Sequence, residues 1–171
     1  MQTLKGKNIL LRAMEPEDID TLYNWENDTS IWHISNTVAP FSRYVVEQYV
    51  FSVQDIYTAK QLRLMIEFDK KPIGCIDIFD FDTNNKKAGI GILIADTMRN
   101  KSYASDALEI LIKYCFNTLQ LHQLYCSILT DNKASLKLFA KHGFTVCGTR
   151  KDWVIVNNEW KDEYFLQLVK Q

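Results

Sequence analysis

The sequence lacks several features that would place the protein in a specialised class. No apolar run approaches the length of a membrane span, and residues 1–6 contain no signal-peptide core. The formal net charge of −1 excludes a generally basic nucleic-acid-binding protein. We therefore expect a cytoplasmic protein with no nucleic-acid partner and no membrane partner.

The distribution of cysteine offers no metal-binding motif. The four residues, Cys75, Cys115, Cys126 and Cys147, are widely separated and lie within apolar strand or helix patterns. Because they lack the spacing of metal ligands, we expect buried, reduced thiols and no bound metal.

The chain shows neither an internal repeat nor a linker-like segment. Its 171 residues, 47% hydrophobic and 24% charged, are typical of a globular domain that is long enough to bury a core. We therefore expect a single domain over residues 1–171.

Charge is distributed unevenly along the chain. Residues 13–42 contain six acidic side chains and no Lys or Arg. Residues 99–151 contain eight basic side chains against three acidic ones, a net of +5. The basic part suits a ligand rich in phosphate. The acidic part either attracts a cationic amine or is a solvated helix face, since acidic residues also favour the first turn of a helix.

The junction at residues 98–105 joins an apolar strand pattern at 89–95 to a helical pattern at 105–117. A helix start of this kind presents unpaired backbone N–H groups and a partial positive charge, so it can hold a phosphate or pyrophosphate. Arg99 and Lys101 add formal charge, and Ser102 and Ala104 are small enough for a ligand to approach the backbone. The alternative is an ordinary capped helix start.

A second segment, residues 131–144, follows a strand pattern at 124–129. Asp131 or Asn132 suits the N-cap of a helix over 132–142, and Gly143 suits the left-handed position that ends it. Another strand is expected directly after this glycine.

The two segments together resemble the motifs of the Gcn5-related N-acetyltransferase (GNAT) family. The first stands as Arg99-x-x-Ser102-x-Ala104, with Ser where the family usually has Gly. The second matches Asn-x-x-Ser/Ala-x-x-Leu-Tyr-x-x-x-Gly-Phe, except that Phe139 stands where many members have Tyr. The resemblance spans essentially the whole chain and is greatest to spermidine acetyltransferases and ribosomal-protein N-acetyltransferases.

Hydrophobic patterning agrees with the fold that this resemblance implies. We expect strands at 8–13, 62–68, 73–81, 87–95, 124–129 and 144–149, and a closing pair at 153–156 and 164–169. We expect helices at 17–27, 43–57, 105–117 and 132–142, with an irregular segment at 28–42. The order β-α-α-β-β-β-α-β-α-β-β is that of the GNAT fold, an α/β (α+β) architecture whose mixed sheet carries helices on both faces.

The resemblance implies that acetyl-CoA is the co-substrate, and it assigns residues to bind it. Main-chain groups of Ile92, Leu93 and Ile94 would hold the pantetheine arm. The pyrophosphate would bind the loop and helix start formed by Arg99, Asn100, Lys101, Ser102, Tyr103, Ala104 and Ser105. Asn132 and Ser135 would lie near the thiol end, and Lys137 would reach the phosphates; the alternative for Asn132 is a helix cap.

Both residues that commonly move protons in the family are missing. Phe139 has no hydroxyl with which to protonate the leaving thiolate, and residues 87–89 contain no carboxylate where many members have Glu. Asp77 and Asp80 are the candidate bases, because a carboxylate among apolar neighbours has a raised pKa if it is buried. On a regular strand the two point to opposite faces, and we favour Asp77. Tyr103 or Tyr125 could substitute as the acid, and His33 and His142 could titrate usefully, although each is commonly a core or surface residue.

Three functions remain open at this point. The first is acetyl-CoA-dependent N-acetylation of a primary amine on a small cationic acceptor such as a polyamine. The second is N-acetylation of a protein N-terminus or an aminoglycoside-like antibiotic. The third is an acyl-CoA-binding GNAT module with little catalysis. A homo-oligomer is compatible with each of them.

Overall fold

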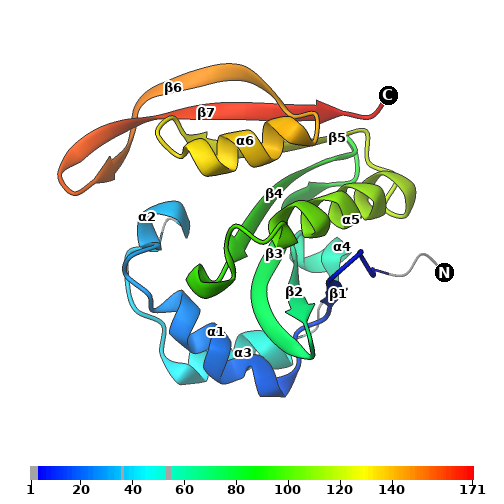
Figure 1. Ribbon diagram of the computed structural model, residues 1–171, viewed down its shortest axis with the longest axis vertical. Coiled ribbons are helices and arrows are strands. Elements are labelled where there is room, and N and C mark those ends of the chain that lie inside the picture. Colours follow the sequence, from blue (N-terminus) through cyan, green and yellow to red (C-terminus); the bar gives the residue numbers. More distant parts are fainter. Residues whose placement is uncertain (1–3, 36, 53–54) are drawn as a thin grey trace.

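The computed structural model describes residues 4–35, 37–52 and 55–171 and shows one seven-stranded sheet in the order β1-β2-β3-β4-β5-β7-β6 (Figure 1). The strands are β1 (Leu10–Arg12), β2 (Leu62–Phe68), β3 (Lys71–Asp82), β4 (Lys87–Ile94), β5 (Gln123–Leu129), β6 (Thr145–Val156) and β7 (Glu159–Val169). Neighbouring strands are antiparallel except β4 and β5, which are parallel. The mixed sheet that the sequence predicts is confirmed.

Four longer helices and several short ones connect the strands. They are α1 (Ile19–Glu26), α2 (Trp32–Ser35), α3 (Arg43–Phe51), α4 (Ile56–Ala59), α5 (Tyr103–Asn117) and α6 (Lys133–Lys141), with 3-10 turns at Pro16–Asp18 and Asp96–Met98. The strands and longer helices follow the predicted order. Within the described ranges, no helix is both long enough and apolar enough to cross a membrane.

The helices cover the sheet from both sides, as Figure 1 shows. On one side α5 buries a face that includes Leu111 against β-strand residues such as Ile90. On the other side Leu22 of α1 and Val46 of α3 pack on Met65 of β2. Each face therefore has its own apolar cluster, and the sheet separates them.

Two predictions for residues 28–57 were wrong. The helix expected over 43–57 ends at Phe51, because Ser52 takes an extended conformation (φ −69°, ψ 157°); residues 53 and 54 lie outside the described residues. A new turn starts at Ile56, where the Asp55 side chain accepts a hydrogen bond from Tyr57 N. The segment expected to be irregular contains α2.

The strands expected at 144–149 and 153–156 form one strand, β6. Its pairing with β7 shifts between Arg150 and Val154, where Asp152 has a φ of +47° and its N–H bonds the Asp162 carboxylate at 3.0 Å. This bulge accommodates the polar residues between the two predicted strands, so β6 continues through them. Strand β7 begins earlier than expected, at Glu159.

The parallel pair β4 and β5 is joined only at one end. Their paired residues are Lys87–Gly89 with Gln123–Tyr125. Beyond this point β4 continues to Ile94 and β5 to Leu129, and the two strands diverge (Figure 1). The sheet is therefore open between its two central strands, and this opening positions the candidate site.

Candidate functional site

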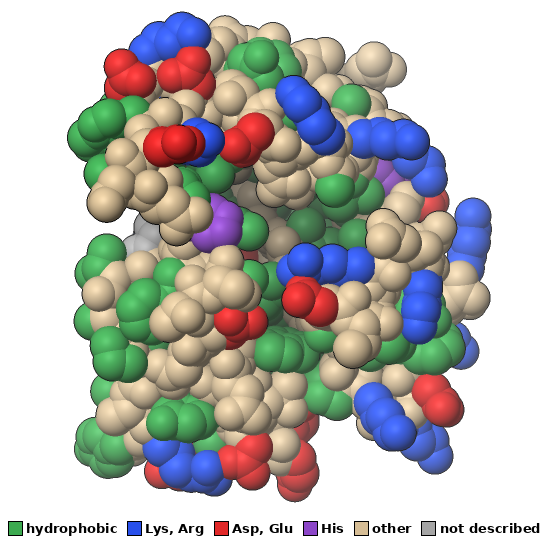
Figure 2. Space-filling view, turned by 60° about the vertical axis from the view of Figure 1, so that its left-hand side comes forward, with side chains coloured by type: hydrophobic (Ala, Val, Ile, Leu, Met, Phe, Trp, Pro, Cys, Tyr) green, Lys and Arg blue, Asp and Glu red, His purple; other side chains and the backbone are tan. Residues whose placement is uncertain are grey.

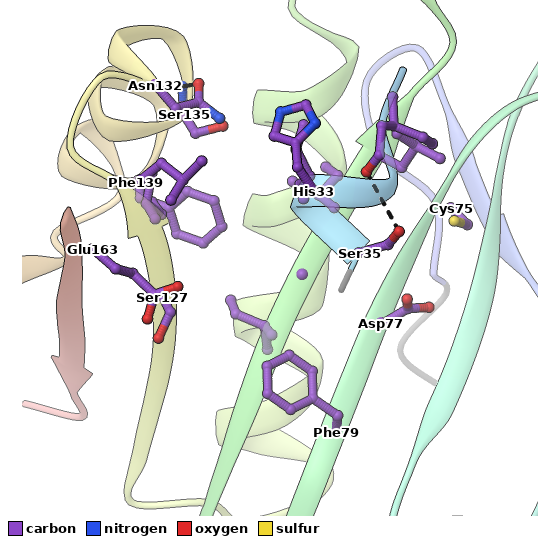
Figure 3. A pocket seen from close by; sticks show the side chains of 18 of the residues that line it. His33, Ser35, Cys75, Asp77, Phe79, Ser127, Asn132, Ser135, Phe139 and Glu163 are labelled. Carbon is purple, nitrogen blue, oxygen red and sulfur yellow. Dashed lines mark hydrogen bonds between the residues drawn. The ribbon is translucent and has the colours of Figure 1, made fainter. Parts of the chain in front are cut away.

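A cavity of about 530 Å³ lies where β4 and β5 diverge. Its walls come from both faces of the sheet, from α1, α2 and α6, and from the two C-terminal strands (Figure 3). The space-filling view shows the molecule hollowed in the middle of the face that it presents, with many Lys and Arg side chains to the right of the hollow (Figure 2). The cavity therefore lies at the gap between the two strands, and a hollow opens on this face of the molecule.

The β4 edge expected to bind the pantetheine arm borders this cavity. Ile92 and Leu93 line it, whereas the Ile94 side chain is 8% exposed and belongs to the core. Within the described residues, β4 has no β5 partner after Gly89. Backbone groups on that edge are consequently available for an added extended chain.

The loop before α5 has the backbone that its motif requires. Asn100 and Ser102 have φ values of +61° and +65°, so Ser102 adopts the left-handed conformation that favours glycine at the family's usual position. Arg99 is tied back to the Ile94 carbonyl at 3.1 Å and to Asp96 at 2.8 Å. Lys101 is exposed, and its Nζ lies 3.8 Å from Met98 Sδ.

The first turn of α5 begins at Tyr103, two residues earlier than predicted. The Tyr103 ring packs on the Phe68 ring, with centroids 4.7 Å apart, and Ala104 packs against the core. The side chains of both residues therefore contribute to packing. Ser102 makes no side-chain cap, which leaves the N–H groups of the first turn exposed to a ligand.

Ser105 links the start of α5 to the end of α6. Its Oγ lies 2.9 Å from His142 Nε2 and accepts a hydrogen bond from Lys141 Nζ at 3.1 Å. Burial and the neighbouring Lys141 lower the pKa of His142. His142 does not line the cavity between β4 and β5, so it is not placed for proton transfer there.

The α6 residues divide between the cavity and the surface. Asn132 caps the helix, accepting a hydrogen bond from Ser135 N at 3.1 Å, and both residues line the cavity. Lys137 is exposed on the outer side of α6. Gly143 has a φ of +87°, which confirms the predicted left-handed helix end.

Phe139 lies at the base of the cavity wall formed by α6. Its ring is 4% exposed and packs edge-on against Phe144, with centroids 5.1 Å apart. It lines the cavity as an apolar surface. The position that carries a hydroxyl in many family members is here part of the core.

The missing glutamate of β4 has a steric explanation. Phe79 on β3 is paired with Gly89, and a Cβ at Gly89 would lie 2.1 Å from Phe79 Cε2. Any side chain at Gly89 would collide with this ring. An aromatic ring therefore occupies the space where a carboxylate would otherwise stand.

Asp77 lies in the cavity, but both of its oxygens are engaged. They accept hydrogen bonds from Arg63 Nε and Nη2, each at 2.8 Å. Arg63 also pairs with Glu26 of α1, and these contacts raise the pKa of Arg63 although burial opposes the charge. Arg63 therefore occupies both oxygens of this carboxylate.

On a regular strand Asp80 would point to the face of the sheet opposite Asp77, but here it does not. The β3–β4 pairing shifts between Phe79 and Asp82, and Asp80 has a φ of +48°. Its carboxylate accepts a hydrogen bond from Tyr125 Oη at 3.0 Å, and the Tyr125 ring packs against Phe79. Burial and this hydrogen bond raise the pKa of Tyr125 to about 12. Neither Asp80 nor Tyr125 is among the residues that line the cavity.

The sequence did not predict the cavity wall that β6 and β7 form with Arg150, Trp153 and Glu163. Arg150 Nη1 donates to Glu163 at 2.8 Å and to Ser127 at 3.2 Å, and its guanidinium lies over the Trp153 and Phe165 rings at 5.1 and 5.2 Å. The available signal was an Arg three residues before a Trp, the Arg directly after one predicted strand and the Trp at the start of the next.

The four cysteines are all reduced, as predicted, but one is not buried. Cys147 is exposed because it lies on β6, the outer strand of the sheet. Cys75 is buried at the cavity, and burial raises the pKa of its thiol to about 12. In the described part of the chain, no group of three or more His, Cys, Asp or Glu is arranged to hold a metal ion.

Comparisons with known proteins agree with this architecture. A family model described as an acetyltransferase (GNAT) domain matches residues 8–145, which include both motifs. The L-amino acid N-acetyltransferase AaaT of Escherichia coli K12 is 29% identical over 111 residues, 65% of this chain and 68% of that protein. The spermidine N(1)-acetyltransferase of the same strain is 22% identical over 158 residues, 91% of this chain and 82% of that protein.

A solved structure has the same fold. The spermidine N-acetyltransferase of Vibrio cholerae, in complex with CoA and spermine, superposes with a TM-score of 0.86. The two sequences are 21% identical, and the match covers 95% of each chain.

Proposed function

The chain belongs to the GNAT acetyltransferase family and is an N-acetyltransferase, and from this premise we propose that acetyl-CoA is its donor and a small cationic amine its acceptor. A polyamine is the leading acceptor class. The observation that supports this proposal most directly is the open gap between β4 and β5, which borders a cavity of about 530 Å³ lined by residues of both strands.

The donor side of the proposal rests on the exposed backbone groups around the gap. The β4 edge that continues past Gly89 without a β5 partner would bind the pantetheine arm as an added strand along Ile92–Ile94. The left-handed loop at Arg99–Ser102 and the uncapped first turn of α5 would hold the pyrophosphate. Acetyl-CoA then presents its thioester carbonyl to the cavity.

The acceptor side rests on the charge of the cavity wall. Three carboxylates, Glu26, Asp77 and Glu163, line it against two guanidinium groups, Arg63 and Arg150. Each carboxylate keeps lone pairs beyond those that its arginine uses. They would bind an acceptor ammonium and orient its nitrogen toward the thioester.

A second acceptor class is favoured by one specific feature. Arg150 uses only Nη1 for its hydrogen bonds, so Nε and Nη2 have no partner among the described residues. A free guanidinium edge suits a carboxylate, as in an amino acid acceptor. The similarity to an L-amino acid N-acetyltransferase supports the same alternative.

Self-association is a further part of the proposal. Strand β6 is an outer strand, and Trp153 and Ile155 on it are 57% and 54% exposed. An edge with exposed apolar side chains favours contact with a second copy of the chain. Light scattering coupled to size-exclusion chromatography gives the oligomeric state.

An acceptor panel tests the function. Purified protein is mixed with acetyl-CoA and spermidine, an aminoglycoside, free amino acids or a peptide with a free N-terminus, and free CoA thiol and acetylated product are measured. Product with spermidine supports the leading class, and product with amino acids supports the second. CoA binding without thiol release for any amine would refute the proposed activity.

A further inference from the structure

The proposed acetyl transfer needs a group that takes a proton from the acceptor ammonium, and the expected groups are unsuitable. Phe139 has no hydroxyl, and the Phe79 ring covers Gly89. Asp77 is held at both oxygens by Arg63. Tyr125 and its partner Asp80 lie outside the cavity lining.

His33 of α2 also lines this cavity. Its imidazole extends into the cavity between α6 residues Asn132 and Ser135 on one side and Asp77 on the other (Figure 3). Among the described residues, nothing forms a hydrogen bond or an ion pair with it. The other titratable side chains of the lining are ion-paired, except Cys75, whose buried thiol keeps its proton.

The chain fixes the position of α2 by hydrogen bonds at both of its ends. The Trp32 indole donates to the Glu26 carbonyl at 2.9 Å, which ties α2 to the end of α1. Thr37 N donates to the Trp32 carbonyl at 3.0 Å. Asn27 bridges to Phe41, accepting from its N–H at 2.9 Å and donating to its carbonyl at 3.1 Å. His33 is therefore held at the cavity by hydrogen bonds that anchor the described residues on both sides of it.

The charges that share the cavity with His33 come from five elements. They are Glu26 of α1, Arg63 of β2, Asp77 of β3, Arg150 of β6 and Glu163 of β7. From α6, only the uncharged Asn132, Ser135 and Phe139 line the cavity. The carboxylates would hold the acceptor cation in the same space as the imidazole.

We propose that His33 is the catalytic base that deprotonates the acceptor, an inference that rests on the proposed function. Neutral imidazole takes one proton from the ammonium, and the freed nitrogen lone pair forms the C–N bond to the thioester carbonyl carbon. The C–S bond then breaks, and the thiolate takes the second proton from the new amide nitrogen. The imidazolium releases its proton to water, so one acetamide, one CoA thiol and one proton are formed.

The test compares His33→Gln with two matched variants in the acceptor assay. His33→Gln should lower kcat about 10²–10⁴-fold, the usual value of general-base catalysis, and leave acetyl-CoA affinity unchanged by calorimetry. His122→Gln changes an exposed histidine far from the cavity lining and should have wild-type kinetics. Asp77→Asn tests the competing base.

The pH profile and chemical rescue separate proton transfer from a structural role. The acidic limb of kcat/KM for the acceptor should disappear in His33→Gln and remain in Asp77→Asn. Added imidazole should restore activity to His33→Ala. Full activity and an unchanged limb in His33→Gln, or loss of the limb in Asp77→Asn alone, would overturn the assignment. A wild type that acetylates no amine would instead refute the proposed function.

Discussion

Replacing Gly89 with alanine tests why this chain has no carboxylate on β4. An ideal Cβ there would lie 2.1, 2.5 and 2.6 Å from three atoms of the Phe79 ring. That ring is held edge-on by Tyr125, with centroids 6.0 Å apart. Forcing an extra carbon into such a contact typically costs about 1–3 kcal/mol. In a protein of this size each kcal/mol lowers Tm by about 2–4 °C.

Gly91→Ala is the matched control because it lies two residues along the same strand. Its Cβ would be 3.9 Å from Phe79 Cε1, an ordinary van der Waals contact. Urea denaturation should therefore show a loss of stability for Gly89→Ala and little or no loss for Gly91→Ala. Equal unfolding free energies in the two variants would refute the steric explanation.

A double variant connects the effect to the ring itself. Phe79→Leu removes the ring, so Gly89→Ala should cost less in the Phe79→Leu background than in the wild type. The double-mutant cycle gives this coupling free energy directly. Additive effects would show that Phe79 is not the group that excludes a side chain at Gly89.

The remaining predictions concern the core, the phosphate loop and acid stability. Phe139→Ala should lower the unfolding free energy by about 3–5 kcal/mol, measured by urea denaturation, because the ring is buried against Phe144. Ser102→Glu should weaken acetyl-CoA binding by about tenfold or more in calorimetry, since like charges near a protein surface repel by about 1–4 kcal/mol at ~4 Å. Burial alone would raise the pKa of Asp18, but the Arg12 hydrogen bonds and the Glu15 N–H outweigh it and lower that pKa. The ionised Asp18 therefore stabilises the fold above its unfolded pKa of about 4, and this stability is lost as the pH falls through the lower folded value. Thermal unfolding of Asp18→Asn should depend less on pH below about 4 than that of the wild type.

The features that the sequence predicted correctly are those whose pattern lies within a short stretch of the chain. The apolar face of α5 buries Leu108 and Leu111 as expected from their helical spacing. Asn132 and Gly143 mark the two ends of α6 through a side-chain cap and a left-handed glycine. These features depend on residues within one or two turns of each other.

The cavity could not be predicted in the same way because its contacts join distant parts of the chain. Arg63 meets Asp77 and Glu26, which are 14 and 37 residues away in sequence. Strand alternation gives the face of each side chain, but it does not say which charged groups will pair across strands and helices. The bulge at Asp80 shows the same limit, since it turns the carboxylate away from its expected face.

A crystal structure with CoA bound is the most direct test of the central claim, that donor and acceptor meet in the gap between β4 and β5. We expect a pantetheine arm paired with the backbone of Ile92–Ile94, a pyrophosphate over Arg99–Ser105, and a thiol that points into the cavity beside His33 and Asp77. A CoA molecule bound elsewhere, with the gap empty or filled by side chains, would contradict it.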